Sequence, residues 1–247
     1  MFEKEYAKKV LEEFLSLPLE NSSDVLEKFA ALPNAIYHND GGKLSFVYVP
    51  GNRGDRVVLA AHADTVWDKY YNVYPCAEQK LQDKNGTYSG TNGICGIGAD
   101  DRAGCAILWS LKDVGHSLLI LDGEENGQMG AKHLRDSYPK LFDEINEHSY
   151  IVQFDRRNAN DYKCYRLPVT EEFKKFIETE TNYKDAGKTA FTDIVTLCTK
   201  ICGVNLSVGY YDEHSSNEMI VFDEWYHTLD VAYNMLTKEQ KKYPLDI

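Results

Sequence analysis

The chain of 247 residues has a formal net charge of −12 at pH 7, with 43% hydrophobic and 27% charged residues. A chain of this length can bury a core without disulfide bonds, and its composition is typical of a globular protein. The negative charge disfavours nucleic acid and anionic membranes as partners, since both require clustered Lys and Arg. Residues 1–19 alternate charged and apolar residues at helical spacing, so we expect neither a signal peptide nor a membrane span.

The predicted elements alternate between helices and strands. The first are two helices, two strands and a hairpin, at about 3–16, 23–31, 43–49, 56–61 and 81–89. We expect the two strands to pair through a turn at 51–54, and Asn85-Gly86 to supply the hairpin turn. The later elements are helix 103–114, strand 117–121, a helix after Gly127, strand 150–154, helices 171–181 and 190–202, strand 204–208 and helix 218–236.

Continuous apolar strands separated by helices predict a mostly parallel sheet covered on both faces, an α/β protein built as a three-layer α/β/α sandwich. The sequence shows no repeat or linker, so one domain is expected. The six cysteines, at 76, 95, 105, 164, 198 and 202, are scattered, and we expect them to be reduced in a cytoplasmic protein. Secretion by an unconventional route stays open.

Chemically active side chains follow four of the predicted apolar strands. His62-Ala63-Asp64 follows VVLAA, Asp122-Gly123-Glu124-Glu125 follows SLLIL, Asp155 follows YIVQF, His214 lies shortly after VNLSV, and Asp100-Asp101 opens the helix at 103. In open α/β sheets, sites form outside the carboxyl ends of the strands. The sequence therefore predicts one site that gathers His, Asp and Glu side chains from five segments.

These residue types suit zinc. Two imidazoles and several carboxylates give nitrogen and oxygen ligands with open coordination positions, as catalytic sites require. Two zinc ions roughly 3.5–4 Å apart can share a bridging carboxylate and water. Three ligating carboxylates against a charge of about +4 leave the site electrophilic. A further carboxylate must stay unligated, because it has to accept the proton of the attacking water.

Five segments together resemble a known clan, the co-catalytic zinc exopeptidases. They are HADT at 62–65, GADDRAG at 98–104, DGEENGQMGA at 122–131, FD at 154–155 and DEHSSNE at 212–218. The clan includes peptidase T, glutamate carboxypeptidase and single-domain zinc aminopeptidases. The resemblance extends from residue 57 to 220 and implies the zinc-peptidase (phosphorylase/hydrolase-like) fold.

The resemblance also implies the roles of individual residues. One zinc ion would be bound by His62 and Asp155, the other by Glu125 and His214, and both by a bridging Asp100. Asp64 would orient the imidazole of His62. Glu124 would be the general base, which takes a proton from the water and gives it to the leaving amine. A cis peptide bond is implied between Asp100 and Asp101. Cobalt or manganese would suit the same ligands.

Several residues allow a simpler interpretation. Asp155 precedes Arg156-Arg157 and could be ion-paired instead of ligating a metal. Asp101 could only form hydrogen bonds at a helix start. Ser215 and Glu218 have the spacing of a capping box that opens the last helix, which we favour over contact of Glu218 with a substrate amine. Tyr70-Tyr71 and Tyr210-Tyr211 could line a pocket. His38, His116, His133, His148 and His227 fit no part of the pattern, and we expect them to be structural or exposed.

The interval from Asp155 to His214 restricts the function. Two-domain members of the clan insert a lid and dimerisation domain here, whereas this interval of 59 residues (214 − 155) has no room for one. We therefore expect 1–247 to be a single catalytic domain without a lid-type dimer, and to be an aminopeptidase or small-peptide hydrolase. The alternatives are an N-acyl amino acid deacylase, an inactive metal-binding relative, and a protein with one occupied metal site, as in glutaminyl-cyclase-like relatives. Side-chain preference and oligomeric state stay open.

Overall fold

The computed structural model describes residues 2–71, 76 and 79–247. Its main sheet has eight strands in the order β1-β2-β6-β3-β7-β10-β8-β9. Neighbouring strands run parallel from β6 through β3 and β7 to β10, whereas β1, β2 and β8 pair antiparallel with their inner neighbours. The strands are β1 (Ile36–His38), β2 (Phe46–Val49), β3 (Val58–His62), β6 (Ser117–Leu121), β7 (Ile151–Arg156), β8 (Asp161–Lys163), β9 (Lys184–Asp185) and β10 (Gly203–Ser207).

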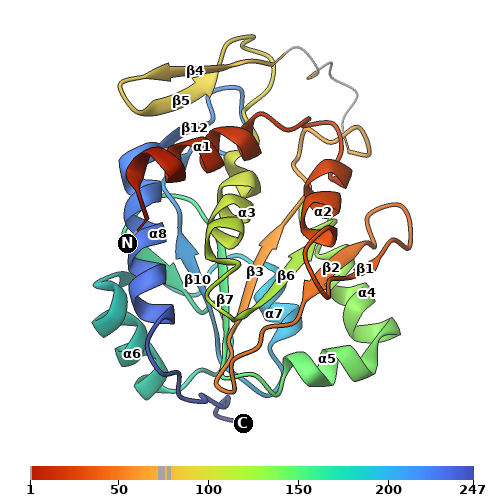
Figure 1. The fold of residues 1–247 in the computed structure, drawn as a ribbon, viewed down its shortest axis with the longest axis vertical. Helices are drawn as coiled ribbons and strands as arrows, with labels where there is room; N and C mark the ends of the chain where they lie inside the picture. Colours follow the sequence, from red (N-terminus) through yellow and green to blue (C-terminus); the bar gives the residue numbers. More distant parts are fainter. Residues whose placement is uncertain (1, 72–75, 77–78) are drawn as a thin grey trace.

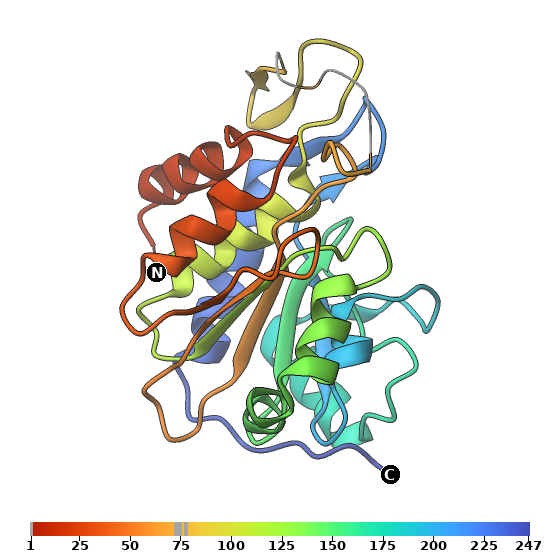
Figure 2. The same ribbon diagram turned by 90° about the vertical axis from the view of Figure 1, so that its right-hand side faces the viewer.

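Helices cover both faces of this sheet, as predicted (Figure 2). One core contains side chains of α1 (Lys4–Leu15), α2 (Ser23–Ala30), α3 (Ala99–Leu111), α6 (Glu171–Thr181) and α8 (Phe222–Leu236). The other contains side chains of α4 (Met129–Ser137), α5 (Pro139–Ile145) and α7 (Asp193–Leu197). The central strands supply both cores because successive side chains alternate: Leu59 joins the first core and Val58 the second. Within the described residues, no helix is long and apolar enough to cross a membrane.

A second, smaller sheet lies at one end of the molecule. Its strands are β4 (Leu81–Lys84), β5 (Thr87–Gly90), β11 (Tyr210–Tyr211) and β12 (Met219–Val221), all antiparallel, in the order β11-β12-β5-β4. The turn of the β4–β5 hairpin is Asn85-Gly86, as predicted, and both residues have positive φ. The arrowheads of β3 and β10 point towards this end of the molecule (Figure 1). The carboxyl ends of the parallel strands therefore face the small sheet.

The predicted pairing of strands 43–49 and 56–61 is wrong. β6 lies between β2 and β3, and β2 pairs with β6 antiparallel. The expected turn instead crosses the start of β6. There Gly51 donates its N–H to Ser117 Oγ, and the backbone of Asn52 bonds the carbonyl of Gly115. These hydrogen bonds hold the connection against β6 and prevent a tight hairpin.

Two predicted helices are shorter in the structure. The helix expected over 190–202 is only α7, because Asn146 Oδ1 accepts the backbone N–H groups of Thr199 and Lys200 and diverts the chain. The helix expected from 218 begins at Phe222, since 219–221 form β12. The predicted capping box is therefore wrong: the residue before α8 is Val221, which provides no side-chain cap.

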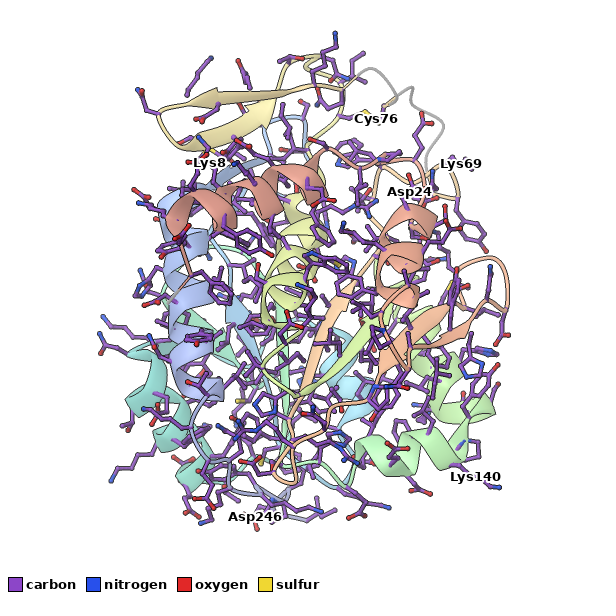
Figure 3. All side chains as sticks on the ribbon, in the orientation of Figure 1. Lys8, Asp24, Lys69, Cys76, Lys140 and Asp246 are labelled. Atoms are coloured by element: carbon purple, nitrogen blue, oxygen red, sulfur yellow. A yellow bond between two sulfur atoms is a disulfide. The ribbon has the colours of Figure 1, made fainter. Side chains whose placement is uncertain are left out.

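The prediction that all six cysteines are reduced is wrong for one pair. Cys76 and Cys95 form a disulfide, and their Cα atoms lie 5.8 Å apart. The β4–β5 hairpin turns the chain back and brings the two residues together. Cys76 is labelled in Figure 3, near the hairpin. The other cysteines, Cys105, Cys164, Cys198 and Cys202, are buried free thiols. A cytoplasmic location stays a prediction.

Candidate active site

The sheet order explains how distant segments meet. β3 lies between β6 and β7, so the residues that end or follow these strands are neighbours. His62 ends β3, Asp155 belongs to β7, and Glu124 and Glu125 follow β6. The start of α3 and the loop after β11 contribute Asp100 and His214. One cavity of 280 Å³ is lined by Asp100, Glu124, Glu125, Asp155 and His214, with His62 buried beside it.

The donor atoms form two groups of three that share Asp100. His62 Nε2 lies 3.1 Å from Asp100 Oδ1 and 3.4 Å from Asp155 Oδ1. His214 Nε2 lies 3.1 Å from Asp100 Oδ2 and 3.1 Å from Glu125 Oε2. Ligands about 2.0–2.1 Å from a tetrahedral zinc ion are roughly 3.3 Å from one another. The distances from each imidazole to its carboxylates therefore suit ligands of a shared ion, and the two oxygens of Asp100 face different imidazoles. Ligand atoms of His62, Asp100 and Glu125 also lie within 4.8 Å of one another, as do those of His62, Asp101 and Asp155.

The site contains more buried negative charge than the protein itself neutralises. Burial, and next the charge of Asp100, raise the pKa of Glu125 to about 7. Burial and then Asp155 raise the pKa of Glu124 well above its usual range. Among the described residues, Glu125 Oε1 and both carboxylate oxygens of Asp193 are buried without a hydrogen-bond partner. A buried carboxylate without a partner is costly, so this donor set fits added cations.

Asp64 contacts both the ring of His62 and the turn that follows β6. The ring nitrogen Nδ1 of His62 lies 3.0 Å from the backbone oxygen of Asp64 and 3.4 Å from its Oδ1. The Asp64 carboxylate also accepts the backbone N–H groups of Gly123 and Glu124, at 2.9 and 3.2 Å, and the hydroxyl of Tyr71 at 2.8 Å. The same side chain thus fixes the ring of His62 and the turn that presents Glu124.

Asp155 is not ion-paired with the arginines that follow it. Arg156 bonds Asp161, and Arg157 bonds Glu213. Polar side chains that the sequence analysis missed hold the Asp155 carboxylate instead, because Gln153 Nε2 and Thr192 Oγ1 both donate to its Oδ2. Its Oδ1 is the oxygen that faces His62. The sequence did contain a signal for such supporting contacts. A polar residue interrupts each of these two apolar strands, Gln153 in YIVQF and Asn205 in VNLSV.

The peptide bond between Asp100 and Asp101 is cis, as the resemblance implied. Asp101 Oδ2 accepts the backbone N–H of His62 at 3.1 Å, and its Oδ1 accepts that of Gly104 at 3.0 Å. Both oxygens of Asp101 therefore serve the backbone, whereas both oxygens of Asp100 face imidazoles.

Glu218 has a role that neither sequence interpretation anticipated. It is buried, and its Oε2 accepts the N–H groups of Ile97 and Gly98, each at 2.7 Å. Its Oε1 accepts the N–H of Asp100 at 3.0 Å. One carboxylate thus binds three backbone amides at the start of α3 and fixes the residue whose two oxygens face His62 and His214. Its position four residues after His214 gave no indication of this contact.

A second buried polar cluster lies behind Asp64. It consists of Ser22, Lys43, Asp68 and Asp122, and we call it the Lys43 cluster. Lys43 Nζ donates to Asp68 at 2.5 Å, to Asp122 at 3.1 Å and to Ser22 at 3.1 Å. Ser22 in turn donates to Asp122. All three ammonium hydrogens therefore have partners inside the chain.

The remaining tyrosines and histidines have varied positions. Tyr210 lines the cavity and Tyr71 contacts Asp64, whereas Tyr70 is exposed and Tyr211 bonds Glu224. None of the five histidines outside the pattern lines the cavity. His116 and His148 are buried and hydrogen-bonded, and the others are half-buried or exposed: His38, His133 and His227.

Three non-glycine residues that line the cavity have left-handed backbone conformations. Tyr165, Ala190 and His214 have φ values of 54°, 77° and 61°. Such conformations cost roughly 1–3 kcal/mol each and concentrate at functional sites, where the surroundings hold them. The cavity wall is thus built with local strain.

The sequence matches no family model and no curated protein. The structure, however, is similar to solved peptidase structures. Aminopeptidase PepT from Bacillus cereus matches with a TM-score of 0.68 and 15% identity, covering 95% of this chain and 98% of that chain. A tripeptidase from Staphylococcus aureus matches with a TM-score of 0.71 and 15% identity, covering 96% and 98%. An aminopeptidase from Desulfurococcus kamchatkensis matches with a TM-score of 0.66 and 12% identity, covering 96% of each chain.

These similarities extend over nearly the whole chain at low identity, so they concern the fold. They agree with the mixed, mostly parallel sheet and its two helical layers. The chain therefore has the fold of these aminopeptidases, which is the zinc-peptidase fold that its motifs predicted.

Proposed function

We propose that this protein is a metallopeptidase that binds two zinc ions and removes residues from the N-terminus of peptides. The observation that carries the proposal is the position of Asp100, whose two oxygens each lie 3.1 Å from a different imidazole. His62 and Asp155 would complete one zinc site, and Glu125 and His214 the other. Cobalt or manganese would suit the same donors.

When bound, the ions would polarise the scissile carbonyl and supply a nucleophilic water at neutral pH. Two carboxylates line the cavity next to a proposed ligand without belonging to either group of three, Glu124 and Glu213. Glu213 is ion-paired with Arg157, so Glu124 is the candidate for the general base. Burial raises the pKa of Glu124 above its usual range, which is the direction that favours a carboxylate as proton acceptor and donor. Glu124 accepts a proton from the attacking water and then donates it to the leaving amine. Asp64 holds the turn of Glu124 in place through backbone hydrogen bonds.

The neighbours' printed activities, aminopeptidase and tripeptidase, support a peptide substrate with a free N-terminus. A glutaminyl cyclase from an Acidobacteriales bacterium also shares the fold, with a TM-score of 0.62 and 13% identity. Because a protein with one occupied metal site stays an alternative, zinc content has to be measured together with activity.

The decisive experiment compares Glu124→Gln with Glu125→Gln. Glu124→Gln is expected to bind two zinc ions per chain and to lose about 10²–10⁴-fold in kcat on the tripeptide Leu-Gly-Gly, since the proton acceptor is gone. Glu125→Gln is expected to lose zinc. Metal analysis and product identification are the measurements. A Glu124→Gln variant that binds zinc and hydrolyses as fast as the wild type would refute the mechanism, and release of acetate from N-acetyl-leucine alone would indicate a deacylase.

A further inference from the structure

Lys163 differs from the other cations beside the candidate active site in its contacts. Lys163, at the end of β8, lines the same cavity as Glu124 and Asp155 and is only 7% exposed. Its Nζ donates to the backbone oxygen of Thr189 at 2.9 Å and to Thr189 Oγ1 at 3.3 Å. Among the described residues, no carboxylate lies within ion-pair distance of this ammonium group. An ammonium has three hydrogens, and beyond Thr189 this ammonium faces the ring of Tyr165, whose centre lies 5.8 Å away, so one hydrogen remains for a charged acceptor.

The other cations of the cavity differ from Lys163 in this respect. Arg156 is bonded through two nitrogens to Asp161, and Arg157 is paired with Glu213. Both arginines line the same cavity. Burial, followed by the charges of Arg156 and Arg157, lowers the pKa of Lys163. In a protein with a net charge of −12, this wall gathers three positive groups and leaves one of them unneutralised.

The sheet register places Lys163 two strands away from β7, the strand that carries the proposed metal ligand Asp155. Asn205 on β10 is opposite both Gln153 on β7 and Lys163 on β8. Strands are about 4.8 Å apart, so the Cα atoms of Gln153 and Lys163 are about 10 Å apart. Asp155 follows Gln153 by two residues on the same strand. A peptide residue spans about 3.5 Å, so the ammonium is within reach of a group one or two residues beyond the scissile amide.

We propose that Lys163 binds a carboxylate of the substrate, one or two residues beyond the scissile amide. The C-terminal carboxylate of a dipeptide or tripeptide supplies such a group, and so does an acidic side chain after the scissile bond. This inference rests on the proposed function and specifies its substrate class as short peptides with a carboxylate near the cleaved bond. Specificity for the carboxylate thus comes from the catalytic sheet itself.

Paired substrates and paired variants test the assignment. Leu-Gly-Gly is compared with its C-terminal amide, and Leu-Asp-amide with Leu-Asn-amide, on the zinc-loaded protein. A hydrogen bond to a charged group strengthens binding roughly tenfold or more. In one of the two pairs, the wild type is therefore expected to have a kcat/KM for the carboxylate substrate about tenfold above that for the neutral substrate. Lys163→Met should remove this preference by raising KM, with kcat and the neutral substrates unchanged within about twofold. Lys163→Arg should restore part of it.

The control is Lys188→Met, because Lys188 is an exposed lysine of the neighbouring loop that does not line the cavity. It should leave the preference intact. A preference in the first substrate pair assigns the carboxylate to the peptide C-terminus, and a preference in the second assigns it to a side chain. The proposal is overturned if Lys163→Met affects charged and neutral substrates equally, or if Lys188→Met has the same effect.

Binding separates this proposal from the proposed function. Calorimetry on zinc-loaded Glu124→Gln, with and without Lys163→Met, measures the affinity for Leu-Gly-Gly, Leu-Asp-amide and their neutral counterparts without turnover. If the wild type hydrolyses none of the peptides, the proposed function fails, while a Lys163-dependent preference in binding still supports the carboxylate site. Equal affinity for charged and neutral peptides would reject that site, whatever the activity.

Discussion

The candidate active site and the Lys43 cluster are neighbouring groups of buried polar residues that differ in how fully their hydrogen bonds are satisfied within the chain. In the Lys43 cluster, one ammonium group donates to two carboxylates and a hydroxyl, so all three of its hydrogens have partners within the chain. In the candidate active site, the carboxylates outnumber the two imidazoles, and Glu125 Oε1 is buried without a hydrogen-bond partner among the described residues. The first arrangement holds the fold together without help. The second has the donor atoms of a possible metal site, which the proposed zinc ions would occupy.

The largest expected effect is the loss of stability when the cation of the Lys43 cluster is removed. Lys43→Met leaves Asp68 and Asp122 buried without their cation, which costs about 3–5 kcal/mol in the free energy of unfolding. Urea unfolding measures the loss. The control is Lys200→Met, because Lys200 forms an exposed ion pair with Asp143 at 2.9 Å, where a loss of about 0.2–1 kcal/mol is expected. Equal losses in the two variants would show that the Lys43 cluster contributes no more than a surface pair.

His148 represents an intermediate case, a buried group that is satisfied in one protonation state only. Its Nε2 accepts from Arg56 and Ser117, so the ring must be neutral, with Nδ1 donating to the carbonyl of Glu144. Burial lowers its pKa to about 4. The unfolded chain, with a pKa near 6.5, binds a proton first on acidification. Stability is therefore complete above pH 6.5 and falls by up to about 3 kcal/mol as the pH drops to 4.

The measurement is urea unfolding of the metal-stripped protein between pH 7 and 4. His148→Asn is expected to be less stable at pH 7 and to lose less on acidification than the wild type. Replacement of the exposed His227 by Asn serves as the control and should follow the wild-type curve. Parallel curves for His148→Asn and the wild type would exclude this account.

The smallest expected effect concerns the support of the candidate active site by Glu218. Glu218→Gln keeps the shape of the side chain but places an amide donor against the backbone N–H groups of Ile97, Gly98 or Asp100. Loss of such a supporting contact weakens metal affinity about 10–100-fold, or roughly 1.4–2.7 kcal/mol. Competition with a zinc chelator at pH 8 measures it. Glu172→Gln, at an exposed position, is the control. Unchanged zinc affinity would show that Glu218 does not support metal binding.

The sequence predicted the layers of the fold and the gathering of the site residues, because both depend on local patterns. Apolar strands followed by His, Asp or Glu place those residues at one sheet edge. The roles of these residues stay predictions. The order of β2, β6 and β3 was not predictable, since the bonds from Gly51 and Asn52 to the segment 115–117 involve residues far along the chain.

The contacts that support the site were missed for the same reason. Glu218 binds amides 118 to 121 residues away, and Lys43 meets Asp122 at a separation of 79 residues. Neither contact leaves a periodic pattern. The disulfide depended on a hairpin that brings Cys76 to Cys95, which the scattered spacing of the cysteines did not reveal.

The position of β10 has a consequence for synthesis. β10 pairs with β7 on one side and β8 on the other, although both are translated before it. A nascent chain that ends before residue 203 therefore exposes the edge of β7, with unpaired backbone groups beside the nearly complete ligand set. His214 and Glu218 emerge later still. The polypeptide can thus assemble the proposed metal site only after residue 214 has been translated, and the edge of β7 stays open until β10 pairs with it.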